Sequence, residues 1–188
     1  RYIYYVAGCV GEFWTEMTCA HLQSLAGWDV PEMAKVGVRF GKGLQLTNVL
    51  KDMARDLQRG RCYLPEVLVR DAGLEPKDLL RKESLPRLRP VLTKLVAVAL
   101  EHLDQGWLYT MAIPRQEVRL RLACMWPILF AGGTLRLVST SPELLNPSVT
   151  LKISKGQVYR NMALTTLTAA CGYVATAYWG RLRKQAGC

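Results

Sequence analysis

The sequence of 188 residues lacks several patterns by which common protein classes are identified. It shows no alternation of apolar and polar residues of the kind that predicts β-strands, no internal repeat and no low-complexity tract. It contains two histidines and six cysteines, which form neither a C-x-x-C pair nor a zinc-ligand spacing. The pattern therefore favours reduced, mostly buried thiols in a cytoplasmic protein.

Acidic residues are also scarce, since 15 Asp and Glu stand against 25 Lys and Arg, a formal net charge of +10. This balance favours anionic partners: phosphorylated substrates, acidic lipid or nucleic acid. Only the segment Pro65–Leu80 could pass for a helix-turn-helix. It carries Asp71, Glu75 and Asp78 where a recognition helix needs Lys or Arg, so we expect no binding of nucleic acid.

What the sequence does contain is long stretches with helical periodicity, which predict an all-α fold around one core. We expect long helices over residues 2–20, 30–59, 85–111, 117–140 and 155–184, and short helical pieces before residue 73 and over residues 75–83. Asp29 and Ser84 are expected to cap the helices that follow them. A Pro- and Asn-rich loop is expected over residues 141–148.

Membrane insertion is a separate question, because Asn161–Gly180 carries no charge and is about long enough to span a bilayer. The stretch is rich in Thr, Ala and Gly, so we interpret it as a buried bundle helix. The basic cluster Arg181–Lys184 that follows is a candidate for contact with acidic lipid headgroups. The expected location is cytoplasmic, with peripheral contact at the inner membrane face.

The stretch Gly43–Pro65 gathers amides and acids on one side of a predicted helix. Gln45, Asn48, Asp52 and Asp56 fall at roughly 0°, 300°, 340° and 20° around its axis. Like charges four residues apart destabilise a helix by about 0.2–0.5 kcal/mol, so two acids kept together beside neutral oxygen donors suit a hard cation. Mg²⁺ prefers oxygen ligands and is usually held by one or two carboxylates together with substrate phosphates.

Cations accompany this acidic stripe in the sequence: Lys51, Arg55, Arg59 and Arg61. Acids for a metal beside cations for a phosphate indicate a diphosphate site. The alternative is a solvated helix face with charge pairs one turn apart.

Three segments together resemble the squalene/phytoene synthase family: Tyr2–Gly11 (YIYYVAGCVG), Gly43–Pro65 (GLQLTNVLKDMARDLQRGRCYLP) and Leu151–Tyr159 (LKISKGQVY). The resemblance covers nearly the whole chain. It implies the isoprenoid-synthase bundle around a central cavity, and head-to-head condensation of two prenyl diphosphates. Residues 1–188 would form the C-terminal two-thirds of one domain, without the N-terminal helices and the first Asp-rich motif. We therefore expect this chain alone to be inactive.

The resemblance assigns roles to residues of the stripe. Asp52 and Asp56 match the second Asp-rich motif, which binds Mg²⁺ with the diphosphate, and Asn48 is a further candidate metal ligand. Gln45 and Asn48 match polar residues that line the diphosphate site. Lys51 falls where the family often has Arg, a change that keeps the charge but loses bidentate geometry.

The resemblance also assigns residues outside the stripe. Arg61 matches a basic residue that follows the second motif. Tyr2 matches the tyrosine that opens Y-x-x-Y-V-A-G and is implicated in the chemistry. Tyr109 matches, more loosely, an aromatic position near the substrate.

Four apolar residues are candidate walls of a dry pocket: Val6, Leu44, Val49 and Leu129. Such a pocket is expected because water would quench the carbocation that the implied reaction produces.

The implied product is squalene, because Ala123–Leu135 and Leu151–Tyr159 look more like squalene synthases than phytoene synthases. Two farnesyl diphosphates would condense through presqualene diphosphate, with NADPH as a possible reductant. Lys152 and Lys155 are the candidate NADPH-binding residues, although Ser154 stands where squalene synthases have a basic residue. A phytoene or dehydrosqualene synthase and a non-catalytic assembly factor are the alternatives.

Overall fold

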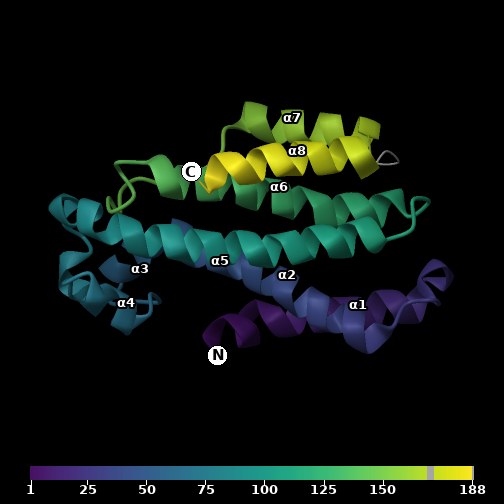
Figure 1. Ribbon diagram of the computed structural model, residues 1–188, viewed down its shortest axis with the longest axis horizontal. Helices are drawn as coiled ribbons and strands as arrows, with labels where there is room; N and C mark the ends of the chain where they lie inside the picture. Colours follow the sequence, from purple (N-terminus) through teal and green to yellow (C-terminus); the bar gives the residue numbers. More distant parts are fainter. Residues whose placement is uncertain (169–171, 188) are drawn as a thin grey trace.

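The computed structural model describes residues 1–168 and 172–187, and all regular elements in those ranges are helical, as predicted (Figure 1). The α-helices are α1 (Cys9–His21), α2 (Val30–Lys51), α3 (Met53–Gln58), α4 (Glu66–Asp71), α5 (Leu85–Ala112), α6 (Val118–Thr140), α7 (Lys155–Thr168) and α8 (Gly172–Ala186). A π-helical turn, η1 (Tyr4–Gly8), precedes α1, and short 3₁₀ turns are η2 (Gln23–Leu25), η3 (Pro76–Asp78) and η4 (Lys82–Ser84).

The long helices α5 and α6 run through the middle of the bundle, with α1 and α2 on one side and α7 and α8 on the other (Figure 1). An apolar stripe along α5 is buried throughout: Leu88, Leu92, Leu95, Val96, Ala99 and Leu103. Burying a side chain of this size stabilises the fold by about 1.5–3 kcal/mol. The α5 stripe therefore anchors the core on which the other helices pack.

Helices α1 and α2 approach until their backbones touch. A Cβ atom at Gly11 would lie 2.0 Å from the carbonyl oxygen of Gly37, and one at Gly41 would lie 2.1 Å from that of Ala7. Only glycine allows a second backbone to come so near. These contacts fix η1 and α1 along α2.

The single helix predicted over residues 30–59 is interrupted at Asp52, where φ is −94° and ψ is 7°. Two backbone hydrogen bonds of 2.9 Å nevertheless cross the break, from Asp52 to Asn48 and from Asp56 to Asp52. The two acids therefore stay one turn apart, although Asp52 lies between α2 and α3 and Asp56 lies within α3.

The predicted helix over residues 155–184 is wrong, because α7 and α8 fold against each other (Figure 1). Tyr178 Oη donates a 2.5 Å hydrogen bond to Asn161 Oδ1. In one straight helix these residues, 17 positions apart, would be separated by about 25 Å. The candidate span Asn161–Gly180 is therefore not one helix. The prediction that it is buried is also wrong, since Leu167 is 86% exposed. Residues 169–171 of this span lie outside the described part.

Length and hydropathy instead single out α6 among the described helices as one that could cross a membrane, with a mean hydropathy of 1.4. Of the 18-residue stretch of α6 with this hydropathy, 56% is buried inside the bundle, and α6 contacts α2, α5, α7 and α8. It continues through Pro127 as one helix. A core helix passes the same test, so the pattern is explained by packing.

The two predicted helix caps have different outcomes. The Asp29 cap is confirmed, since Asp29 Oδ1 accepts a 3.1 Å hydrogen bond from Glu32 N. The Ser84 cap is wrong, because Ser84 ends the turn η4 in a helical conformation and makes no capping bond. The helical piece expected over residues 75–83 is the pair of turns η3 and η4.

The expected burial of the thiols is also wrong for most of those described. Cys9, Cys19, Cys62 and Cys124 are free, and only Cys124 is buried, where desolvation raises its pKa to about 12. Cys171 and Cys188 lie outside the described residues.

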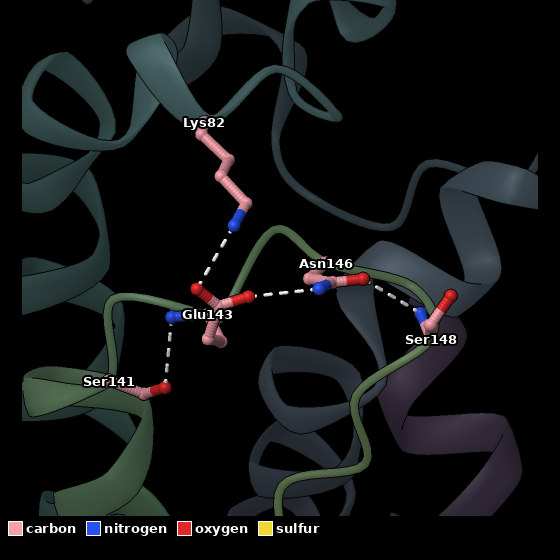
Figure 2. A network of polar contacts seen from close by, with 5 residues as sticks. All are labelled: Lys82, Ser141, Glu143, Asn146 and Ser148. Carbon is pink, nitrogen blue, oxygen red and sulfur yellow. Dashed lines mark hydrogen bonds and ion pairs between the residues drawn. The ribbon is translucent and has the colours of Figure 1, made fainter.

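The predicted loop after α6 is held by a polar network centred on Glu143 (Figure 2). Lys82 Nζ donates to one carboxylate oxygen at 3.0 Å, and Asn146 Nδ2 donates to the other at 2.9 Å. Asn146 Oδ1 in turn accepts from Ser148 N, and Ser141 Oγ accepts from Glu143 N. The network fastens the loop to the turn that precedes α5.

We expect the Glu143 network to weaken in acid. The hydrogen bond from Asn146, followed by the contact with Lys82, holds the pKa of Glu143 below its ordinary value. The stabilisation is present above the unfolded pKa of about 4.3 and is lost as pH falls through the lower folded value. A carboxyl ¹³C titration should show the Glu143 pKa rising towards ordinary in Asn146→Ala; an unchanged pKa would contradict this account.

The helix contact gives a second prediction. Gly11→Ala should destabilise the fold by about 1–3 kcal/mol, because its methyl group would collide with the Gly37 carbonyl. Gly180→Ala is the matched control: no atom lies within 4 Å of its Cβ position, so it should stabilise α8 by up to about 1 kcal/mol. Urea unfolding measures both, and equal effects would refute the close contact.

Candidate active site

A cavity of about 370 Å³ lies between η1–α1, α2 and α6, with one residue of α5 in its wall. Its lining is mainly apolar and aromatic, and includes Val6, Trp14, Phe40, Leu44, Tyr109 and Pro127. The predicted walls Val6 and Leu44 are confirmed. Val49 and Leu129 are corrections: both are core residues, at 5% and 0% exposed, because they lie on the sides of their helices that face the bundle.

The cavity has a polar end formed by α2. Gln45 and Asn48 line it, and Asn48 is exposed. A second hollow of about 320 Å³ shares Leu44, Asn48 and Pro127 with the first and reaches Lys51. The two hollows therefore adjoin at Asn48, and the second places a cation near the polar end of the cavity.

The predicted metal-binding acids follow Asn48 and Lys51 along the chain, line neither of these two hollows, and are both half-buried. Asp52 is paired with two cations: its carboxylate lies 3.2 Å from Lys51 Nζ and 3.8 Å from Arg55 Nη1. Arg55 also donates a 2.5 Å hydrogen bond to Thr150, which brings the loop before α7 close to Asp52. No cluster of three or more His, Cys, Asp or Glu that could hold a metal occurs in residues 1–168 and 172–187.

Tyr2 lies near Asp56 and Arg61. Its ring stacks on that of Tyr63, with centroids 4.6 Å apart and planes 16° from parallel. The hydrogen bond with Tyr63 and, to a smaller extent, the charge of Asp56 raise the pKa of Tyr2, while Arg61 opposes them. Tyr2 therefore remains a neutral phenol at neutral pH.

Tyr63 is the member of this group that the sequence analysis did not single out. It lines a small hollow with Asp56, Arg61 and Leu57. Its place two residues after Arg61 in the same motif was the only sign in the sequence.

Tyr109 lies at the other end of the cavity. It is 1% exposed, its hydroxyl lies 3.1 Å from Thr15 Oγ1, and its ring meets Trp28 edge-on at 5.2 Å. Thr15 packs on Gly37, which is 11 residues and about 16 Å along α2 from Asn48. Tyr109 is therefore placed to contact a hydrocarbon chain, and a diphosphate at the polar end is out of its reach.

The candidate NADPH residues do not join this group. Lys152 and Lys155 are both exposed, and neither lines either hollow. Leu151 between Thr150 and Lys152 is buried and holds the segment against the bundle.

The arrangement suits an amphipathic anion. An apolar cavity can hold a hydrocarbon chain, and the amides, acids and cations at its end can bind a charged head group with a divalent ion. The fold and the site therefore define the class of protein: an all-α bundle whose apolar cavity ends at polar and charged side chains.

Comparison with known proteins identifies the family. The sequence model of squalene/phytoene synthases matches residues 1–157. The chain is 30% identical over 161 residues to a squalene synthase of Gibberella zeae, covering 86% of this chain and 34% of that one. It is 37% identical over 95 residues to a phytoene synthase of Thermus thermophilus, covering 50% and 30% of the two chains.

The chain therefore belongs to the squalene/phytoene synthase family, as the motifs predicted. The solved structure of TcSQS with the ligand BPH1237 matches with a TM-score of 0.78 at 19% identity, over 99% of this chain and 58% of that one, and confirms the fold. The chain spans about a third of the length of the curated relatives it matches.

The buried end of the cavity gives a testable prediction. Tyr109→Phe should lower the free energy of unfolding by about 1 kcal/mol, because one buried hydrogen bond with Thr15 is lost while Thr15 keeps its 2.8 Å bond to Gly11 O. Tyr159→Phe is the control, because Tyr159 is 68% exposed. Urea midpoints compare the two, and equal values would show that the hydroxyl pair contributes nothing.

Proposed function

We propose that the protein containing this chain condenses two prenyl diphosphates head to head, after Mg²⁺-assisted ionisation of an allylic diphosphate. The observation that carries the proposal is the apolar cavity that ends at Gln45 and Asn48 and leads to Lys51, beside the acids. Family membership supports it, since both squalene and phytoene synthases are among the relatives.

The donor set fits magnesium. Asp52, Asp56 and Asn48 offer oxygen atoms, which Mg²⁺ prefers, and leave positions for water and phosphate oxygens. When bound, the ion supplies positive charge at the departing diphosphate. Lys51 and Arg55 now neutralise Asp52, and a metal on that carboxylate would leave both cations to face the phosphate oxygens.

Tyr2 and Arg61 complete the charged end of the site. As a neutral phenol, Tyr2 donates a hydrogen bond to a diphosphate oxygen without adding negative charge. Arg61 is always charged and presents several donors in a fixed fork, which suits a diphosphate. Both therefore stabilise charge that develops as the carbon–oxygen bond breaks.

The cavity protects the cation that remains. Its apolar walls exclude water, which would quench an allylic carbocation. Trp14, Phe40 and Tyr109 place aromatic rings along it, and a cation over such a face gains about 0.5–2 kcal/mol.

The finer proposal is that two farnesyl diphosphates yield squalene through presqualene diphosphate. The candidate NADPH residues Lys152 and Lys155 lie outside both hollows, so the incubation assay tests the reductant separately. The alternative is a phytoene or dehydrosqualene synthase. Incubation with C15 and with C20 diphosphates, with and without NADPH, followed by analysis of the hydrocarbon, separates these outcomes. A non-catalytic relative is less favoured, because Asp52 and Asp56 are both present.

Further parts of the proposal concern the surroundings of the enzyme. We propose a cytoplasmic location with peripheral membrane contact, no nucleic-acid partner, and no turnover by this chain alone. In the basic cluster Arg181–Lys184, which lies in the last turns of α8, Arg183 already pairs with Asp104 at 2.7 Å, whereas Arg181 is exposed. Arg181 is therefore the better candidate for contact with lipid headgroups.

The metal assignment is tested by Asp52→Asn in the complete enzyme. This change should abolish Mg²⁺-dependent binding of a non-hydrolysable farnesyl diphosphate analogue and lower kcat by about 10²-fold or more, because a charged ligand is lost. Calorimetry with and without Mg²⁺ measures the binding. Asp71→Asn, on the exposed end of α4, should behave as wild type, and wild-type behaviour of Asp52→Asn would defeat the assignment.

A further inference from the structure

Building on the proposed function, we propose that Tyr63 is a positioning residue that holds the phenol of Tyr2 beside Asp56 and Arg61. The ring of Tyr63 fixes where the Tyr2 hydroxyl points. Tyr63 itself need not touch the substrate.

The stacking geometry is the first support. The two rings lie 4.6 Å apart and 16° from parallel, so that face-to-face contact restricts both the place and the tilt of the Tyr2 ring. Offset-stacked rings at this separation are a favourable arrangement. Tyr2 is 45% exposed, so the described core covers it only in part.

Tyr63, by contrast, is held firmly. Gly60 adopts a φ of 74°, which turns the chain after α3, and Arg61 N then donates a 2.9 Å hydrogen bond to Asp56 O. Leu64 on its other side is 6% exposed and anchors the segment in the core. Tyr63 is half-buried against Leu57 and can act as a fixed platform.

The platform links two distant parts of the sequence. Asp56 and Arg61 share a hollow with Tyr63, and Tyr2 stacks on the same ring. One side chain therefore joins the segment Tyr2–Gly11 to the segment Gly43–Pro65. A hydroxyl misplaced by about 1 Å can cost about 10²-fold in rate. Loss of the platform should therefore act on catalysis and leave substrate binding nearly unchanged.

The experiment compares Tyr63→Leu with Tyr63→Phe in the complete enzyme. Leu keeps apolar bulk in the hollow without a ring face, and Phe keeps the ring without the hydroxyl; Tyr63→Met serves if the Leu variant does not fold. We expect Leu to lower kcat by about 10²-fold with little change in KM. Phe should lose no more than about fivefold, the equivalent of one hydrogen bond.

A second readout follows Tyr2 directly. In protein labelled with 3-fluorotyrosine, the ¹⁹F resonance of Tyr2, assigned with Tyr2→Phe, should move in Tyr63→Leu and stay near its wild-type position in Tyr63→Phe. Tyr173→Ala, a change at an 85% exposed tyrosine on α8, should alter neither kcat nor that resonance.

Three results would overturn the proposal: an unmoved Tyr2 resonance in Tyr63→Leu, equal loss of kcat in the Leu and Phe variants, or an effect confined to KM. The ¹⁹F readout does not depend on turnover. If the wild-type enzyme acts on no prenyl diphosphate, the proposed function fails, while the resonance still decides whether Tyr63 positions Tyr2.

Discussion

The backbone contact between α1 and α2 is the constraint on which the site depends. Glycines at positions 11, 37 and 41 let the two helices approach without intervening side chains. Helix separation is set by the side chains at the contact, so a larger residue there would move η1 and α1 outward. Val6 and Trp14 of the cavity wall, and Tyr2 at the charged end, are carried on that same segment.

The second organising feature is the placement of charge along α2 and α3. Gln45 and Asn48 face the cavity, and Asp52 follows where the helix breaks but its hydrogen bonds continue. The apolar part of the site lies towards Gly37, and the charged part lies beyond Asn48. An amphipathic ligand would therefore have one orientation, because its head group would be costly to desolvate and its chain favourable to bury.

Local patterns predicted much of this molecule correctly. The long helix α5, the Asp29 cap and the spacing of Asn48, Asp52 and Asp56 by about one turn all rest on neighbours that are close in the sequence. The errors arose where distant segments decide the outcome. The division of residues 155–184 into α7 and α8 was missed because this stretch contains no proline and shows continuous helical composition. The Tyr178–Asn161 bond that joins the two helices is a tertiary contact.

The sequence by itself determined the helical class, the family and the residue types available to bind a diphosphate, because these follow from periodicity and from motifs contiguous in the chain. Only the tertiary structure decided that Tyr109 lies at the buried end, that Val49 and Leu129 belong to the core, and that Tyr63 meets Tyr2. Helical periodicity states which residues share a face. It does not state which neighbour that face meets, since that depends on how closely helices pack, and here on glycines whose partners lie on another helix.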